Sequence, residues 1–348
     1  MRVRVLVLAL LLTACTSNEP PEPAPAQSNS APAVQKPWDP RDVDELPAAA
    51  DDVAPGLPAR VEPPDAAPTL ATKPLSAAVL SVDRRDGRIQ LLGVDGSWRE
   101  VRLPNPHGRL ALSRALLSPD GTHLAALLDD GIEVWDLPTG ERSRLSLPAR
   151  FEPWDYSWIG WVDDDALLLD DLKAGWRIDT ITGVADAVPY PAGMSFGWTL
   201  DDRGAVVEVD DPAEGDVLTD WGGGVRRYVD MSTTGRLSSI QARGDTVVGT
   251  SYDDGEFAVY DADRSDLSPR HRLRVRDHQG NYSNWGLRTV RILDDGSVLL
   301  WVAVPSRRSD VDGWRIVRWV PSTDRLEVVT TSQGDPSEPM TFASDLLD

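Results

Sequence analysis

The stretch that decides the fold reads Ser-Pro-Asp-Gly at Ser118–Gly121 and, after an apolar run, Gly-Ile-Glu-Val-Trp-Asp-Leu-Pro-Thr-Gly at Gly131–Gly140. The first motif indicates a turn, because Pro, Asp and Gly each favour a particular turn position. The second alternates apolar with polar residues and ends in another turn, which is typical of a half-buried strand. Similar short runs with turn signals every eight to twelve residues continue from residue 75 onward. The sequence therefore predicts an all-β fold.

The pattern Asp-x-x-Thr-Gly recurs at an offset of 43 residues, from Asp136–Gly140 to Asp179–Gly183. Repeats of about 40 to 45 residues are typical of propeller blades. Equivalent anchors, each a strand followed by a turn, fall at Leu92, Trp135, Ile178, Leu218, Tyr260 and Trp319. Six anchors predict a six-bladed β-propeller over residues 75–348, with seven blades as the alternative.

Ser118–Gly121 together with Gly131–Asp136 resembles the repeat of WD40 and TolB-like propellers, most closely over residues 112–147. The resemblance implies a ring of blades and a divergent member of that wider group. Propellers serve both binding and catalysis, so this resemblance does not assign a function.

The first blade lacks a strand of its own, because it begins with the run Ala77–Val82 and nothing earlier offers a partner. A ring of blades must hide its strand edges. The run Met340–Leu347 is therefore predicted to supply the missing strand, so that the propeller closes by pairing its N- and C-terminal strands.

The N-terminus carries Arg2 and Arg4, then the apolar run Val5–Leu12, then Thr-Ala-Cys ending at Cys15. This order predicts a signal peptide over residues 1–14, since the run is much shorter than the ~20 residues of a membrane span. Cys15 is the only cysteine of the chain and cannot form an intramolecular disulfide. The pattern resembles that of bacterial lipoproteins, which implies a lipid on Cys15 and residence at the extracytoplasmic face of the cell membrane.

Residues 15–74 are rich in Pro, Ala and acidic residues and cannot bury enough apolar surface to fold alone. The first part, to about Gln35, is predicted to be a tether. For residues 37–65 two alternatives stay open: the segment docks on the propeller, or it stays free. Five apolar residues spaced among the prolines would anchor a docked segment: Trp38, Val43, Leu46, Leu57 and Val61.

The chain has 56 acidic and 35 basic residues, a formal net charge of -21. Such a charge argues against nucleic acid as a partner. It also opposes binding to anionic lipid, so membrane residence is expected through the Cys15 lipid alone.

Antiparallel meanders place the second-to-third turn of every blade on the same face as the loops that join the blades. On this face the middle four blades present aspartate pairs, an acidic arc made of Asp129, Asp130, Asp170, Asp171, Asp210, Asp211, Asp253 and Asp254. The first and last blades present arginine pairs instead, namely Arg84, Arg85, Arg307 and Arg308. The aspartates are also good formers of tight hairpins, so a structural role for the arc stays open.

The loops between blades on that face are long and aromatic. They contribute His107, Trp154, Tyr156, Tyr190, His278, Asn281, Tyr282 and Trp285. Aromatic, amide and imidazole side chains on loops over a rigid scaffold are typical of surfaces that bind sugars or peptides. Packing between blades is the alternative role for the tryptophans. With the arginine pairs, these residues form the candidate binding face.

Catalytic and metal-binding signals are few. Ser195 lies in a Gly-x-Ser-x-Gly pattern without the strand-to-helix turn that would expose it, and the four histidines lack metal-ligand spacing. We therefore expect no catalytic residue, no metal and no cofactor, and a monomeric, non-catalytic module that binds an envelope protein or glycan. The alternatives are an extracytoplasmic enzyme of the glycoside hydrolase, lyase or lactonase type that uses channel carboxylates, and a Ca²⁺-dependent sensor that uses the acidic arc.

Overall fold

The structure, a computed structural model, describes residues 36–84, 86–103, 115–128, 130–149, 158–170, 175–188, 197–200, 206–209, 217–220, 227–230, 237–253, 256–276, 286–305, 311–336 and 338–348. These residues belong to one compact unit, Lys36–Asp348, which begins well before residue 75. The predicted signal peptide, Cys15 and residues 16–35 lie outside the described residues. Within the described ranges, no helix has the length and apolar character that a membrane span requires.

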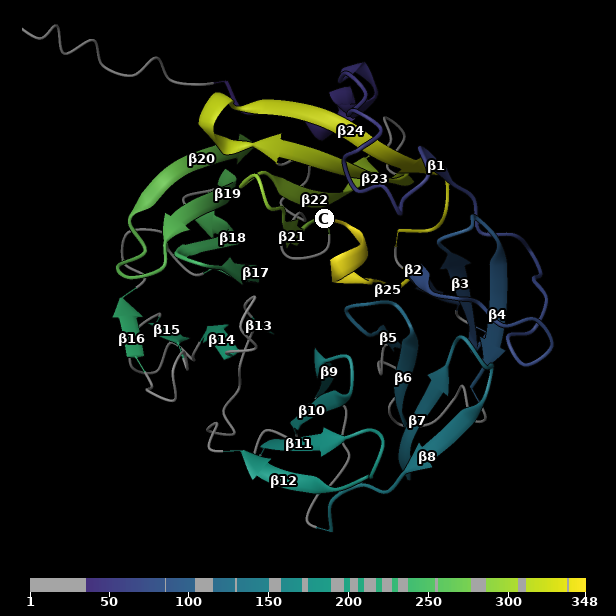
Figure 1. Cartoon of the computed structure of the whole chain (residues 1–348). Coiled ribbons are helices and arrows are strands. Elements are labelled where there is room, and N and C mark those ends of the chain that lie inside the picture. The colour runs from purple at the N-terminus through teal and green to yellow at the C-terminus, as the bar shows by residue number, and fades with distance from the viewer. Residues whose placement is uncertain are drawn as a thin grey trace, which may run out of the picture. The chain divides into compact units, whose positions relative to one another are not determined.

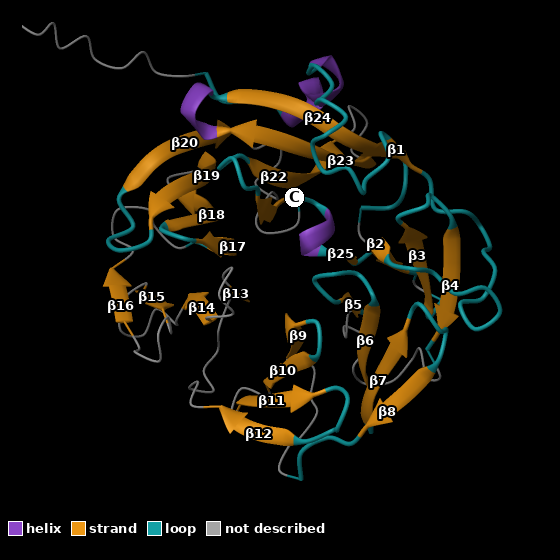
Figure 2. Cartoon of the chain, in the orientation of Figure 1, coloured by secondary structure: helices purple, strands orange, loops and turns teal. Residues whose placement is uncertain are grey.

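Antiparallel sheets make up almost all of the regular structure, and each is a meander of neighbouring strands. In Figure 1 the sheets are arranged radially, with one end strand of each near the centre. In the described parts of the chain, Figure 2 shows only short helical turns among the strands. These are the 3-10 helices η1 (Pro40–Glu45), η4 (Pro321–Thr323) and η5 (Ser344–Leu346).

The sheets are named here in chain order, and each is given from its inner to its outer strand. The first contains β25 (Met340–Phe342), β2 (Ala78–Asp83), β3 (Arg88–Gly93) and β4 (Trp98–Arg102). The second contains β5 (Leu116–Leu117), β6 (His123–Leu128), β7 (Gly131–Asp136) and β8 (Arg142–Leu145). The third contains β9 (Trp158–Asp163), β10 (Ala166–Asp170), β11 (Gly175–Asp179) and β12 (Ala185–Val188).

The fourth sheet contains β13 (Gly197–Leu200), β14 (Val206–Val209), β15 (Val217–Asp220) and β16 (Arg227–Asp230). The fifth contains β17 (Ser238–Arg243), β18 (Thr246–Asp253), β19 (Glu256–Asp263) and β20 (Pro269–Val275). The last contains β21 (Leu287–Ile292), β22 (Val298–Pro305), β23 (Val311–Val320), β24 (Arg325–Ser332) and β1 (Arg60–Val61).

The chain is therefore an all-β propeller, but the prediction of six blades, with seven as the alternative, needs correction because not every sheet is a regular blade. Within the described residues, five sheets have the four strands of a regular blade, and the last sheet has five strands. Its extra strand, β1, comes from the Pro-rich segment and pairs with β24 in parallel, unlike the antiparallel pairs inside the blades. A count of repeat anchors does not detect this strand because it lies outside the repeats.

The repeated motifs are turns closed by side chains. In the turn between β7 and β8, the Asp136 carboxylate accepts hydrogen bonds of 2.8 Å from both the backbone N–H and the hydroxyl of Thr139. The carboxylate of Asp179 accepts the same pair of bonds from Thr182, at 2.7 and 2.9 Å. The glycine that follows has a φ of 72° at Gly140, a conformation that disfavours other residues. The sequence repeat is thus explained by turn geometry.

The first sheet receives its inner strand from the far end of the chain. β25 pairs antiparallel with β2, with Leu80 opposite Phe342 and Val82 opposite Met340. The Ala343 N–H extends this contact with a 3.1 Å bond to the Val79 carbonyl. We call residues 338–348 the tail. Because β2 would otherwise present a free edge, the tail closes the ring.

Residues 36–75, which we call the strap, run along the outer strands of the fifth, last and first sheets in turn (Figure 1). Trp38 pairs in parallel with Val275 of β20, Ala48 with Val328 of β24, and Thr69 with Glu100 of β4. The backbone bonds at these points are 2.8 to 3.0 Å long. The strap therefore covers backbone groups that outer strands would leave unpaired.

The strap also fills the spaces between sheets. Val43 packs in the core between the fifth and last sheets. Ala54, Leu57 and Val61 pack in the core between the last and first sheets. Leu70 and Leu75 pack in the core between the first and second sheets. A buried arginine on β23, Arg315, has its counter-ion here, because Asp44 of η1 accepts its Nε at 2.9 Å. The strap is thus part of the folded unit.

The tail is expected to be essential for folding. Deleting residues 336–348 removes the partner of β2 and empties the buried places of Met340 and Leu347. The truncated protein should aggregate or melt at a much lower temperature, which thermal unfolding and size-exclusion chromatography would measure. Deletion of residues 1–35 is the control and should leave melting unchanged. Equal melting of the tail deletion and the intact chain would contradict this assignment.

Replacing one buried strap residue should be costly. Leu70 is 1% exposed in the core between the first and second sheets. Leu70→Ala should therefore reduce the free energy of unfolding by about 2–4 kcal/mol, as large-to-small core changes do. Lys73→Ala, on the exposed side of the same segment, should change it by less than about 0.5 kcal/mol. Chemical denaturation of both variants tests this, and similar small losses would mean that the strap is only loosely attached.

Candidate functional site

Most of the predicted binding face lies outside the described residues. This applies to Arg85, His107, Trp154, Tyr156, Tyr190, His278, Asn281, Tyr282, Trp285, Arg307 and Arg308. It also applies to Asp129, Asp171, Asp210, Asp211 and Asp254 of the acidic arc. Their role in binding stays a prediction.

The described members of that face lie at the second-to-third turns of their sheets. Arg84 follows β2 and donates from Nη1 to Glu338 Oε2 of the tail at 2.9 Å, so it also fastens the closing strand. Asp130 is exposed and forms an ion pair with Arg144. Asp170 and Asp253 are the last residues of β10 and β18, each directly before the turn of its hairpin. In this group, Arg84 and Asp130 contribute to local structure.

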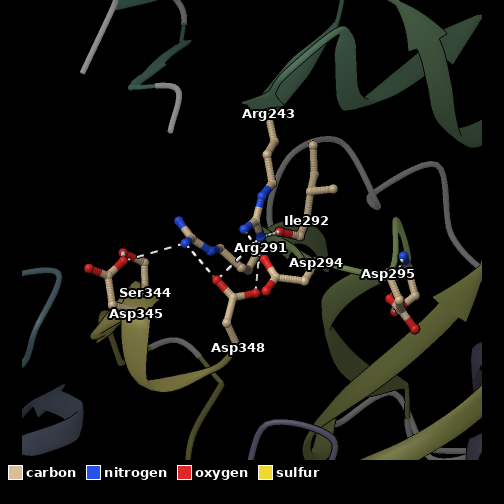
Figure 3. Close-up of polar contacts among 9 residues, drawn as sticks. Arg243, Arg291, Ile292, Asp294, Asp295, Ser344, Asp345 and Asp348 are labelled. Atoms are coloured by element: carbon tan, nitrogen blue, oxygen red, sulfur yellow. Dashed lines mark hydrogen bonds and ion pairs between the residues drawn. The ribbon is translucent and has the colours of Figure 1, made fainter. Parts of the chain in front are cut away.

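The opposite face, which carries the first-to-second and third-to-fourth turns, holds a cluster that spans three parts of the chain (Figure 3). We call Arg243, Arg291, Asp294, Asp345 and Asp348 the mouth cluster, because η5 of the tail lies near the centre of the ring (Figure 1). Arg243 is the last residue of β17. Arg291 lies near the end of β21 and Asp294 follows that strand, while Asp345 and Asp348 belong to the tail.

Asp348 is the centre of this cluster. Its carboxylate accepts from Arg243 Nη1 at 3.0 and 3.2 Å and from Arg291 Nη2 at 2.8 Å. Arg243 also donates to the Ile292 carbonyl at 2.8 Å and pairs with Asp294. Arg291 reaches Asp345 at 3.4 Å. Two arginines thus bind the tail to the fifth and last sheets.

A second group of carboxylates lies on the same face. The Asp120 N–H donates to Asp164 Oδ1 at 3.1 Å, which joins the turns of the second and third sheets. The Asp345 N–H donates to the Pro119 carbonyl at 3.0 Å. Side-chain bonds at the turns therefore connect the second sheet to the third and the fifth to the last around the mouth, and the tail takes part in both groups.

The carboxyls of Asp120 and Asp164 have opposite pKa shifts. Burial alone would raise the pKa of Asp120, but hydrogen bonds from Ser118 and Thr122 outweigh it and lower the pKa. Burial raises the pKa of Asp164, and the nearby charges of Asp120 and Asp345 raise it further. All three bonds to Asp120 from these neighbours are 2.6 to 2.9 Å long. This carboxylate is therefore held in its ionised form by the turn.

Sequence reasoning did not identify the mouth cluster. Its ion pairs join residues that are 51 to 105 positions apart, and neither arginine belongs to a repeated motif. The one available signal was the aspartate-rich turn at Asp294 and Asp295, which has counterparts at Asp163–Asp165. Only the meeting of the tail with β17 and β21 shows which of these charges have a partner.

Searches with the sequence gave no match, either to a protein-family model or to a curated protein. Solved structures do resemble the fold. The WD40 repeats of RRP9 superpose with a TM-score of 0.49 at 14% identity, over 74% of this chain and 81% of that one. TolB from Acinetobacter baumannii gives a TM-score of 0.47 at 13% identity, over 74% and 66% of the two chains.

Virginiamycin B lyase from Staphylococcus aureus is also similar in fold, with a TM-score of 0.47 at 13% identity over 79% of this chain and 94% of that one. WD40 and TolB-like β-propellers are thus among the structural neighbours. At such identities the likeness concerns the β-propeller fold and carries nothing about function.

The raised pKa of Asp164 leads to a pH-dependent prediction. A carboxyl whose pKa is higher in the folded state stabilises the fold below its unfolded pKa, near 3.8, and this stabilisation is lost as the pH rises through the folded pKa. Asp164→Asn keeps the acceptor for the Asp120 N–H and removes the charge. Melting at pH 7 should therefore rise by about 1–3 °C, and the gain should disappear below about pH 4.

The neighbouring exposed residue provides the control for this measurement. Asp165→Asn should leave the melting temperature within about 1 °C of the parent at both pH values. A neutral-pH gain as large in the control as in Asp164→Asn would show a general charge effect of this acidic chain, rather than repulsion among Asp120, Asp164 and Asp345.

Proposed function

We propose that the protein is a lipid-anchored extracytoplasmic lipoprotein whose propeller is a non-catalytic module for binding an envelope protein or glycan. The observation that supports this most directly is the route of the chain. A lone cysteine is followed by a Pro/Ala-rich tether, and the tether leads at Lys36 into a strap bonded to three outer strands. A tether of about 20 residues spans about 25 Å if flexible and about 60 Å if it is extended as polyproline II.

The attachment of the strap suits such a role. A pull on the tether acts on Trp38, whose N–H and C=O are bonded to Arg274 and Arg276 at 2.8 Å, and on the η1 segment behind it. The load is therefore applied to backbone pairs and to the buried Val43 rather than to an unprotected end of a blade. A rigid ring with the long loops that the sequence predicts on one face would be a suitable scaffold for recognition.

An enzyme is the second candidate, and one observation favours it. Asp120 and Asp164 are adjacent carboxyls whose pKa values shift in opposite directions, as those of acid–base pairs do. The turn hydrogen bonds already use the Asp120 oxygens, so a structural role explains the pair better. Hydrolysis of an envelope glycan that is lost in Asp164→Asn would reverse this preference.

The anchor is tested by Cys15→Ser. The parent protein, with Cys15 in place, should sediment with membranes and be released by detergent, because a cysteine that carries several acyl chains is a stable anchor. Cys15→Ser should appear in the soluble fraction, whereas Ser28→Ala in the tether should behave like the parent protein. Retention of Cys15→Ser in the membrane fraction would contradict lipid anchoring.

The binding face is tested by crosslinked capture from native membranes. The variant Arg85→Gln/Arg307→Gln/Arg308→Gln removes three charges from the predicted face. The control Arg60→Gln/Arg102→Gln/Arg325→Gln removes three charges from exposed arginines elsewhere. We expect a partner that the first variant loses and the control keeps. A partner retained by both variants, or no partner, would contradict the role of this face.

A further inference from the structure

The outer strand of the fifth sheet, β20, and the residue that follows it carry an unusual row of charge. Arginine occupies positions 270, 272, 274 and 276, so four arginines alternate with other residues in a chain whose net charge is -21. Side chains two residues apart point to the same face of a strand and lie about 7 Å from each other. The row is therefore a basic stripe about 20 Å long, which we call the arginine row.

Packing confirms which face carries the row. Leu273 and Val275 belong to the core shared with the last sheet, so the odd positions point inward there. Arg272 and Arg274 are opposite Tyr260 and Ala258 of β19 on the other face, and the Arg272 guanidinium lies 5.2 Å from the Tyr260 ring centre. Arg270, Arg272 and Arg276 are exposed. Arg270 forms an ion pair with Asp263 at 2.6 Å, and Arg276 forms one with Asp39 at 3.5 Å.

The backbone groups of the same residues lie on the outer edge. The Trp38 N–H donates to the Arg274 carbonyl, and the Arg276 N–H donates to the Trp38 carbonyl, so the even residues direct their polar backbone groups away from β19. Among the described residues, Trp38 is the strand partner on this edge, and it occupies only the position beside Val275. The edge beside His271 and Leu273 has the same alternation of backbone groups.

Trp38 and Asp39 show what this edge binds. Trp38 packs against the core beside Val275, while Asp39 contacts Arg276 on the arginine face. An apolar residue followed by an acidic residue thus complements the successive residues Val275 and Arg276. The chain's own preceding segment does not continue the match, because residues 27–37 contain no acidic residue, one lysine and two prolines. In the register of Trp38 beside Val275, Lys36 corresponds to the apolar Leu273 and Pro37 to Arg274, so neither residue has the character that the edge would match.

We propose that the edge of β20 is a docking site for an extended acidic peptide of a partner protein, in which apolar and acidic residues alternate. The peptide adds to β20 as a strand, with its apolar residues beside Leu273 and its acidic residues opposite the arginine row. The spacing supports this choice, since alternate residues of an added strand repeat at the same ~7 Å as the row. The proposal depends neither on the lipid anchor nor on the predicted loop face.

The probe is a fluorescent peptide, Glu-Val-Glu-Val-Glu-Val-Glu, titrated against the full chain. We expect saturable binding that weakens with salt. In Arg272→Gln/Arg274→Gln the affinity should fall about tenfold, because two cross-strand charge pairs are lost. The control Arg60→Gln/Arg102→Gln removes the same charge from exposed arginines elsewhere and should bind like the parent. Unchanged melting temperatures would show that both variants fold.

Two methylated peptides separate strand addition from simple charge attraction. Valine stands where Trp38 does, so its N–H faces the edge; N-methylation at the valines should abolish binding. N-methylation at the glutamates, whose N–H groups face away, should leave binding largely intact. The proposal is overturned if neither methylation matters, if polyphosphate competes as well as the parent peptide, if the arginine variant binds normally, or if the peptide does not bind at all.

Discussion

The whole fold depends on how the seam between the last and the first sheet is closed. Two segments from opposite ends of the described chain meet there: the tail supplies the inner strand β25, and the strap supplies Ala54, Leu57 and Val61 to the core of the seam. Gly56 shows how closely they pack, since a Cβ at this position would lie 2.9 Å from the Leu346 carbonyl oxygen. The seam is thus held by backbone pairing near the centre and by apolar packing outside it. The strap and the tail also contact the next sheets on either side, the second and the fifth.

The turns on the mouth side explain part of the acidic composition. Asp95, Asp120, Asp179, Asp263 and Asp295 each accept hydrogen bonds from a serine or threonine two or three residues away, and in each the pKa is lowered. A lowered pKa means that the folded state gains stability above the unfolded pKa and loses it as the pH falls. These aspartates therefore stabilise turns, and a net charge of -21 does not by itself indicate a cation site. Asp130 of the acidic arc likewise has a structural partner, because it forms an ion pair with Arg144.

The sequence predicted the features that recur and missed those that occur once. The anchors Leu92, Trp135, Ile178, Leu218, Tyr260 and Trp319 all lie in the third strand of their sheets, because each blade repeats the same turn chemistry. The strap has no repeat, so its docking could not be decided: its prolines indicate a tether, and its scattered apolar residues indicate a core. The extra strand β1 and the contacts of Arg243 and Arg291 with Asp348 arise between distant segments, where neither spacing nor periodicity carries a signal.

The path of the strap follows the length of the outer strands. It pairs with β24 of eight residues, β4 of five and the end of β20, which has seven. The outer strands β8, β12 and β16 have four residues each, and no strand is paired outside them in the described structure. Short edges offer few free backbone groups, so leaving them uncovered adds little risk of unwanted pairing. β20 is the exception, a long edge covered at one end. Its arginines disfavour basic strands, and residues 27–37 offer them no acidic side chain, so this edge is selective instead of closed.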